Sequence, residues 1–238
     1  MEMDAQENNE YLLMFNALDP VEENFLYNIL QLIINYPLVW FNFLENILKN
    51  KIMISFRNRA LIVSLELLTR QLRNSFEQIY RLMLKSDVVL NAIEKKGFLI
   101  IYVYSDAISE FFQNSGFWLE YLTAHACREI GFPCYRGALF KTKDRQISEV
   151  DVLIDLGKVL FFIECKDTYL CSEEDLKKID SLRKRINRQS YGLFVCTKTV
   201  NLDFKKYGLG LIKYKYNYEA FREELKEMLA GRIVSLSF

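Results

Sequence analysis

The chain has 238 residues, of which 51% are hydrophobic and 26% are charged. This composition supplies enough apolar side chains for a buried core and excludes an intrinsically disordered protein. Lys and Arg together number 31, as do Asp and Glu, so the overall charge does not indicate nucleic-acid binding. Residues 115–238 alone carry 21 basic and 17 acidic groups, a small local excess of positive charge.

The five cysteines form no CxxC pair and the chain has one histidine, so we expect no zinc site. The first ten residues are acidic and polar, which is not the pattern of a signal peptide. Polar residues and a proline interrupt the apolar stretch 25–48, so we expect no membrane association. Together these features predict a cytoplasmic protein, located in the host cell if the chain is viral.

Residues 1–110 are expected to form an N-terminal helical region behind a loose tail at 1–10. Asp19-Pro20 has the pattern of a helix start, and Pro37 divides a first helix from a second that ends near Lys49. Apolar residues then recur every three or four positions, which predicts one long helix whose apolar stripe is either the core of a helical bundle or a dimer interface. This stripe consists of Leu61, Leu65, Leu68, Leu72, Phe76, Ile79 and Met83.

Residues 111–238 are expected to form an α/β domain. A helical segment at 116–130 is followed by β-prone runs at 132–140, 149–156 and 158–165. A helix at about 173–188, strands at 191–196 and 209–214, and a last helix at about 217–230 complete the pattern. This order predicts a central mixed sheet flanked by helices.

Three residues that can carry chemistry meet at one predicted hairpin. The segment 149–156 and the apolar run 159–163 flank a turn with Gly157, which indicates two antiparallel strands. The second strand ends in Glu164-Cys165-Lys166, and alternation places Glu164 and Lys166 on the same face. Asp151 enters on the partner strand, so two carboxylates and a lysine are expected at one end of the sheet.

This combination of groups suits phosphodiester hydrolysis assisted by Mg²⁺ or Mn²⁺. Carboxylate oxygens of Asp151 and Glu164 are ligands for a hard divalent cation, which lowers the pKa of a bound water. Lys166 would orient or deprotonate that water, or stabilise charge on the phosphate. Glu120, on the preceding helix, would add a further carboxylate. The alternative readings are a surface hairpin with an ordinary Glu–Lys pair and a solvated helix residue at Glu120.

The order Gly116-x-x-x-Glu120, Gly131-Phe132, Asp151 and Glu164-x-Lys166 resembles the PD-(D/E)XK nuclease superfamily over residues 115–215. It is similar to archaeal Holliday-junction resolvases. It is more similar to the nuclease domain of CRISPR ancillary effectors that sense cyclic oligoadenylate. The resemblance implies a restriction-endonuclease-like core, metal ligation by Asp151 and Glu164, catalysis by Lys166 and support from Glu120. The sensor domain of those effectors has no counterpart in residues 11–95, which are expected to be helical.

The resemblance also makes Glu149 an auxiliary metal ligand, since it matches an acidic residue two positions before the aspartate. The helix at 173–188 is basic and follows the catalytic strand, so it is a candidate for phosphate contact; its alternative is a solvated face. The candidate residues are Lys177, Lys178, Arg183, Lys184, Arg185 and Arg188.

The sequence therefore predicts a metal-dependent endonuclease that acts on nucleic acid, with DNA preferred to RNA as the substrate. We expect a homodimer, with a tetramer as the alternative assembly. Two other functions remain open at this point. The fold could bind nucleic acid without cutting it, or the N-terminal half could make the chain an interaction protein.

Overall fold

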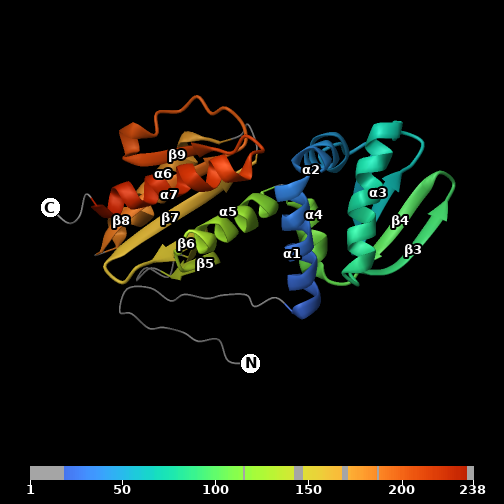
Figure 1. Cartoon of the computed structure of the whole chain (residues 1–238), viewed down its shortest axis with the longest axis horizontal. Coiled ribbons are helices and arrows are strands. Elements are labelled where there is room, and N and C mark those ends of the chain that lie inside the picture. The colour runs from blue at the N-terminus through green and yellow to red at the C-terminus, as the bar shows by residue number, and fades with distance from the viewer. Residues whose placement is uncertain (1–18, 115, 142–146, 168–170, 187, 235–238) are drawn as a thin grey trace. The chain divides into compact units, whose positions relative to one another are not determined.

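The computed structural model describes residues 19–114, 116–141, 147–167, 171–186 and 188–234 (Figure 1). The chain divides into two compact units, one of residues 18–118 and one of residues 1–17 and 119–238, which we call the N-terminal and C-terminal units. The expected tail at 1–10 lies outside the described residues. Among the helices that are described, none is both long and apolar enough to cross a membrane.

The helices of the N-terminal unit begin where the sequence predicts. In α1 (Pro20–Asn35), the Asp19 side chain accepts hydrogen bonds from the backbone N–H groups of Val21 and Glu22, and Glu22 completes a capping box. The Pro37 start of α2 (Pro37–Phe43) is likewise confirmed, and a π-helical turn (Leu44–Leu48) extends it. Helices α3 (Arg70–Lys85) and α4 (Asp106–Gln113) follow later in the chain.

A four-stranded antiparallel sheet lies in the same unit. Its strands are β1 (Ile54–Arg57), β2 (Ala60–Ser64), β3 (Val89–Lys95) and β4 (Phe98–Val103), in the spatial order β1-β2-β4-β3. Two-residue turns close both hairpins, Asn58-Arg59 between β1 and β2 and Lys96-Gly97 between β3 and β4. All four turn residues have positive φ, the conformation that matches the twist of paired strands.

The expectation that residues 11–95 are helical is therefore wrong for β1, β2 and β3. The apolar stripe at 61–83 does not lie on one helix, because Leu61 belongs to β2 and the helix starts only after Thr69. Thr69 accepts the N–H of Leu72, which caps α3 at that point. Leu61, Phe76 and Ile79 of the stripe are at most 3% exposed and lie in the core of this unit, whereas Leu65 and Leu72 are partly exposed. The predicted dimer stays a prediction.

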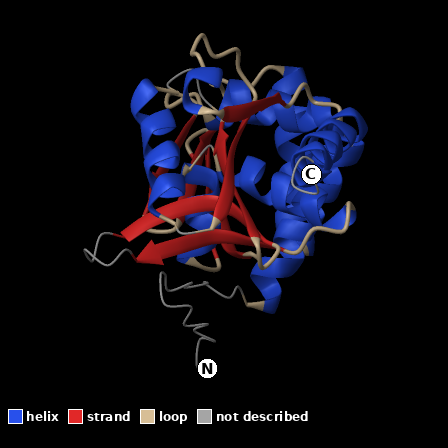
Figure 2. Ribbon diagram, turned by 90° about the vertical axis from the view of Figure 1, so that its left-hand side faces the viewer, coloured by secondary structure: helices blue, strands red, loops and turns tan. Residues whose placement is uncertain are grey.

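The C-terminal unit has the predicted α/β architecture. Helix α5 (Phe117–Glu129) precedes three antiparallel strands, β5 (Cys134–Lys141), β6 (Ile147–Asp155) and β7 (Val159–Lys166). Helix α6 (Glu173–Arg185) then leads to β8 (Gln189–Cys196) and β9 (Leu209–Lys213), which are parallel to β7. Helix α7 (Tyr218–Val234) follows. The five strands lie in sequence order and twist relative to one another (Figure 2).

Strand β7 is the buried centre of this sheet, as its apolar sequence predicts. Its side chains alternate between two covered faces. Leu160 and Phe162 belong to a core cluster with residues of α6, whereas the thiol of Cys165 lies 3.6 Å from the Thr123 hydroxyl of α5. This alternation directs Glu164 and Lys166, at the end of the strand, toward α6.

Gly192 allows α6 and β9 to pack closely against β8. A Cβ at this position would lie 2.3 Å from Cδ2 of Leu209 and 2.8 Å from Cγ2 of Ile179. We expect Gly192→Ala to lower the free energy of unfolding by about 1–3 kcal/mol, because both neighbours must move. Urea denaturation followed by far-UV circular dichroism measures the change. A matched control is Gly231→Ala in α7, where an added Cβ meets no atom within 4 Å; a loss of stability as large in the control would contradict the packing argument.

Candidate active site

The pairing of β6 with β7 brings Asp151 close to Glu164. The antiparallel register runs from Asp155–Leu160 to Val152–Ile163, the residues next to these two acids. Asp151 Oδ2 accepts a hydrogen bond of 2.7 Å from the backbone N–H of Cys165. The bond fixes the Asp151 carboxylate against the end of β7. The two acids that the sequence assigns to one site are thus brought together.

Two lysines approach the same oxygen of Glu164, and its two carboxylate oxygens therefore differ in their surroundings. Lys166 Nζ lies 2.9 Å and Lys178 Nζ 3.5 Å from Glu164 Oε1. Lys166 also lies 3.4 Å from Oδ1 of Asp175, at the start of α6. Glu164 is 2% exposed, and its Oε2 is buried with no hydrogen-bond partner among the described residues. A buried carboxylate oxygen normally has a partner, so this atom points to a missing cation or donor.

Glu120 reaches the same group of acids from α5. It is buried, and its Oε2 lies 3.6 Å from the guanidinium of Arg136 on β5. Arg136 also stacks on the ring of Tyr121, 3.8 Å from its centroid, which fixes the guanidinium beside Glu120. The reading of Glu120 as a solvated helix residue does not fit this burial. Glu149 is exposed on β6, and its carboxylate lies near Gly137.

Burial, with repulsion between the acids adding to it, raises the pKa values of Glu120 and Asp151. Burial raises the pKa of Glu120 to about 8, and repulsion from Asp151 adds to that rise against the opposing effect of Arg136. Burial, and then the charge of Glu164, raise the pKa of Asp151 to about 7. Raised carboxyl pKa values of this kind mark a site in which negative charge is concentrated, a common feature of functional sites.

Lys166 keeps its positive charge in this environment. Burial alone would lower its pKa, but the charge of Glu164 and the hydrogen bond to that residue outweigh burial and raise the pKa above its ordinary value. A lysine with a raised pKa is a poor base at neutral pH. Of the roles that the sequence left open for Lys166, stabilisation of negative charge fits best.

The donor set fits a hard divalent cation, though not through three protein carboxylates at once. Within the described residues, no group of three or more His, Cys, Asp and Glu side chains is arranged to hold a metal ion together. Asp151 and the free oxygen of Glu164 would hold a cation, with water completing its coordination. Glu120 and Glu149, the other two predicted ligands, would not coordinate that cation directly.

The six basic residues predicted for phosphate contact have different surroundings. Arg183 lies 3.0 Å from Asp180 and donates to the carbonyl oxygens of Tyr207 and Gly208, so it holds α6 to the loop before β9. Arg188 lies 2.5 Å from Asp155 and fixes the end of β6. Lys178 belongs to the active site itself, because it approaches Glu164.

The other three basic residues of this set are exposed. Lys177 lies 3.9 Å from Glu173 and Lys184 lies 2.6 Å from Asp180, with side chains 60% and 70% exposed. Arg185 is exposed as well. An exposed ion pair is weak enough to be exchanged for a phosphate group.

Two residues of the site were not predicted from the sequence. The contact of Arg136 with Glu120 joins a strand to a helix across the fold, and no local sequence pattern predicts it. Asp175 accepts hydrogen bonds from the backbone N–H and hydroxyl of Ser172 as part of the α6 capping box, and it also approaches Lys166. The Ser172-x-x-Asp175 pattern predicts the cap, but no local signal predicts the contact with Lys166.

The fold is shared with solved structures. The protein VC1899 from Vibrio cholerae matches with a TM-score of 0.56 and 17% identity, over 92% of this chain and 58% of that one. Can2 from Sulfobacillus thermosulfidooxidans, in complex with cyclic tetra-adenylate, matches with a TM-score of 0.55 and 18% identity, over 93% of this chain and 57% of that one. The present chain thus spans less than two thirds of either structure. At this identity the likeness shows the fold. No protein-family model and no curated protein matches the sequence.

The raised pKa values predict that stability depends on pH. Glu120 and Asp151 bind protons more tightly in the folded than in the unfolded chain, so the free energy of unfolding falls as the pH rises. In buffer with EDTA we expect a loss on the order of 2 kcal/mol between about pH 5 and pH 8.

Glu120→Gln should make this loss smaller and should stabilise the protein at the upper end of the pH range. The control Glu227→Gln changes an exposed acid of α7 and should keep the parental dependence. Urea denaturation at a series of pH values measures both. Parallel curves for Glu120→Gln and the parent protein would show that Glu120 does not carry the shift.

Proposed function

We propose that this chain is a metal-dependent nuclease that hydrolyses phosphodiester bonds, with DNA as the preferred substrate. The observation that carries the proposal is the buried Oε2 of Glu164, which has no hydrogen-bond partner in the part of the chain that the structure describes and lies near a second carboxylate, Asp151. The shared fold of VC1899 and Can2 and the resemblance to PD-(D/E)XK nucleases support the same conclusion.

The acids and the lysine of the candidate site have different roles in the proposed reaction. A divalent cation, when bound, supplies a Lewis acid and lowers the pKa of a coordinated water. Asp151 and Glu164 hold the negative charge that attracts that cation. Lys166, which stays protonated, stabilises the charge that develops on the phosphate oxygens. Glu120 is partly protonated near neutral pH and can hydrogen-bond to water at the edge of the site.

The substrate's path would follow the exposed basic residues of α6. Lys177, Lys184 and Arg185 are solvent-accessible and belong to the same helix as Lys178. Cations along one helix provide sequence-independent contacts to the phosphate backbone. Arg183 and Arg188, which have carboxylate partners inside the fold, serve that path by holding the helix and β6 in place.

A second candidate function is nucleic-acid binding without cleavage. The arrangement around Glu164 Oε1 favours it, because two ammonium groups already neutralise this acid. The lack of a three-ligand group among the described residues favours it as well. In this alternative the lysines, rather than a cation, are the permanent partners of the acids.

Substitution of the central residues tests the enzymatic proposal. We expect Asp151→Asn and Lys166→Met to lower the rate of Mg²⁺- or Mn²⁺-dependent cleavage by at least about 100-fold, because each removes a charge needed in the transition state. The assay uses labelled duplex, single-stranded and branched DNA and RNA. Glu227→Gln and Lys226→Met, which change exposed residues of α7, are the matched controls. Parental cleavage by either site variant would refute the assignment, and binding without cleavage by the parent protein would favour the alternative.

Metal binding can be measured without cleavage. A cation that binds only the folded chain raises its melting temperature. We expect millimolar Mn²⁺ to raise the melting temperature of the parent protein at neutral pH, and to have little effect on Asp151→Asn or Glu164→Gln. Differential scanning calorimetry with and without Mn²⁺ gives the comparison. An equal shift in the parent and both variants would place the cation elsewhere.

A further inference from the structure

One face of the four-stranded sheet in the N-terminal unit carries exposed apolar and aromatic side chains. The residues that alternate with them, such as Leu61, Val63 and Ile101, are fully buried. On the opposite side of the strands, Phe98 is 45% exposed, Ile93 43% and Tyr102 38%. We call this side the outer face. Its residues are Ser55 and Arg57 of β1, Ala60, Ile62 and Ser64 of β2, Phe98, Ile100 and Tyr102 of β4, and Asn91, Ile93 and Lys95 of β3.

The strand register arranges these residues in three rows across the sheet. The middle row is aliphatic, with Ile62, Ile100 and Ile93 side by side. In one flanking row, Tyr102 lies between Asn91 and Ala60, and Ala60 is paired with Arg57. In the other, Phe98 lies opposite Lys95. Each aromatic ring therefore shares a row with a cationic side chain, on opposite sides of β4.

The strand residues of the outer face include two cations, Arg57 and Lys95, and the Glu66 carboxylate lies at the end of the sheet, beside Gly97 of the turn before Phe98. Neither Asp nor Glu is among the strand residues of this face, and Arg57 and Lys95 form no ion pair with any described carboxylate. Arg59, in the adjacent turn, differs because it pairs with Asp106. The wider segment 49–96 agrees with this sign, since it contains ten Lys and Arg residues against four Asp and Glu residues.

The exposed aromatic rings and the cationic side chains of the outer face together indicate which class of partner could bind there. A second copy of the same face would bring cations against cations without a compensating carboxylate on the strands, which disfavours self-association through it. A partner with planar apolar groups and regularly spaced negative charges fits both features. Single-stranded nucleic acid has this chemistry, because its unstacked bases can lie on aromatic rings while its phosphates meet Lys and Arg. A duplex keeps its bases stacked inside and could not use the rings.

We propose that the outer face binds single-stranded nucleic acid, with bases stacked on Phe98 and Tyr102 and phosphates near Lys95 and Arg57. Stacking tolerates any base, so the face should bind with little sequence preference. It lies on a different unit from the acids of the candidate active site, and the proposal does not require that site to be catalytic.

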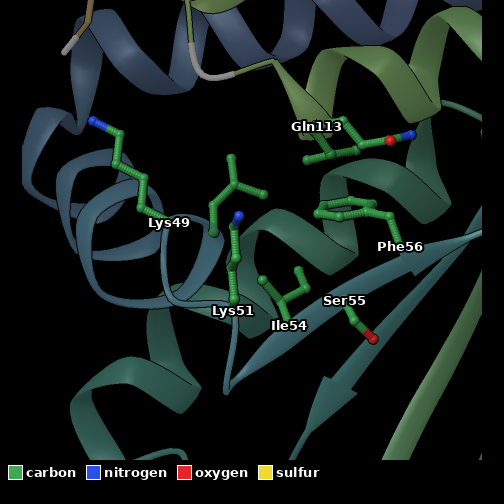
Figure 3. A pocket seen from close by; sticks show the side chains of 8 residues that line it. Lys49, Lys51, Ile54, Ser55, Phe56 and Gln113 are labelled. Atoms are coloured by element: carbon green, nitrogen blue, oxygen red, sulfur yellow. The ribbon is translucent and has the colours of Figure 1, made fainter. Parts of the chain in front are cut away.

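A pocket beyond the edge strand β1 extends this surface. It has a volume of about 500 Å³, and Ser55 lines it while also belonging to the outer face. Leu48, Ile54, Phe56 and Phe112 give it apolar walls. Lys51 extends toward the middle of the pocket, whereas Lys49 points away, toward the Glu45 carboxylate 2.7 Å from its ammonium group (Figure 3). Lys51 would thus meet a phosphate of a strand that crosses β1.

Binding of short labelled oligonucleotides to the full chain in EDTA tests the proposal. Fluorescence anisotropy with single-stranded DNA and RNA of mixed sequence gives the Kd, and EDTA prevents metal-dependent cleavage. We expect Phe98→Ala and Tyr102→Ala each to weaken binding at least about fivefold, since each removes one stacking platform. Lys95→Gln and Arg57→Gln should weaken binding and also reduce its dependence on salt.

Matched controls separate the outer face from general effects. Tyr27→Ala removes an exposed tyrosine of α1, and Lys226→Gln removes an exposed lysine of α7; neither should change the Kd. Phe98 and Tyr102 are exposed, so neither substitution removes a core side chain. Circular dichroism checks that both variants are folded. Unchanged binding in both aromatic variants, or equal binding of a blunt duplex, would overturn the proposal.

Separate measurements distinguish a failure of this binding proposal from a failure of the nuclease proposal. Asp151→Asn should lose cleavage but keep oligonucleotide binding by the outer face. The aromatic variants should keep the Mn²⁺-dependent rise in melting temperature that reports on Asp151 and Glu164. Loss of self-association in the aromatic variants, measured by light scattering and without any change in the Kd, would instead identify the face as a protein interface and refute the proposal.

Discussion

The withdrawal of three neighbouring carboxylates from water is the constraint on which the C-terminal unit depends. Glu120, Asp151 and Glu164 come from α5, β6 and β7; burial raises the pKa of Glu120 and of Asp151, and the charge of Glu164 adds to both rises. Burial of like charges is unfavourable unless cations, protons or hydrogen bonds compensate it. The fold supplies all three, through Lys166 and Lys178 at Glu164, the Cys165 N–H at Asp151, and proton uptake by Glu120.

The apolar sheet makes this concentration of charge possible. Strand β7 is buried along seven consecutive residues, from Val159 to Cys165, and helices cover both of its faces. Such a strand holds its end firmly, so Glu164 cannot turn toward solvent to relieve the repulsion. The stability gained by burying the strand offsets the instability of the acids at its end, which is the usual relation between a core and an active site.

The sequence was most informative where the chemistry lies on a single hairpin. Alternation with a period of two, a turn at Gly157 and an apolar run were enough to place Asp151, Glu164 and Lys166 together. The contacts of Arg136 with Glu120 and of Asp175 with Lys166 could not be predicted, because they join elements whose relative position depends on the whole packed unit. The local sequence pattern predicts the register of neighbouring strands. It does not predict which residue of a helix contacts the end of a strand.

The N-terminal unit shows how the same reasoning fails. Leu61, Leu65 and Leu68 continue the three- and four-residue spacing of α3 by coincidence, although Leu61 lies in a strand and Thr69 caps the helix. A five-residue strand contains too few residues to distinguish a period of two from a period of 3.6. The turn residues Lys96-Gly97 were the stronger signal, because a two-residue hairpin ending in glycine is typical of paired strands.

Charge balance connects the site as it stands with the function proposed for it. Four carboxylates, those of Glu120, Asp151, Glu164 and Asp175, face three cationic side chains, Arg136, Lys166 and Lys178, so the group carries one net negative charge when all seven are ionised. A divalent cation at Glu164 Oε2 would compete with the lysines for Glu164 and would remove the reason for Asp151 and Glu120 to hold protons. The site would then carry net positive charge, which a phosphodiester and a developing phosphorane would neutralise. Lys166 and Lys178, released in part from Glu164, would be the groups able to turn toward that phosphate.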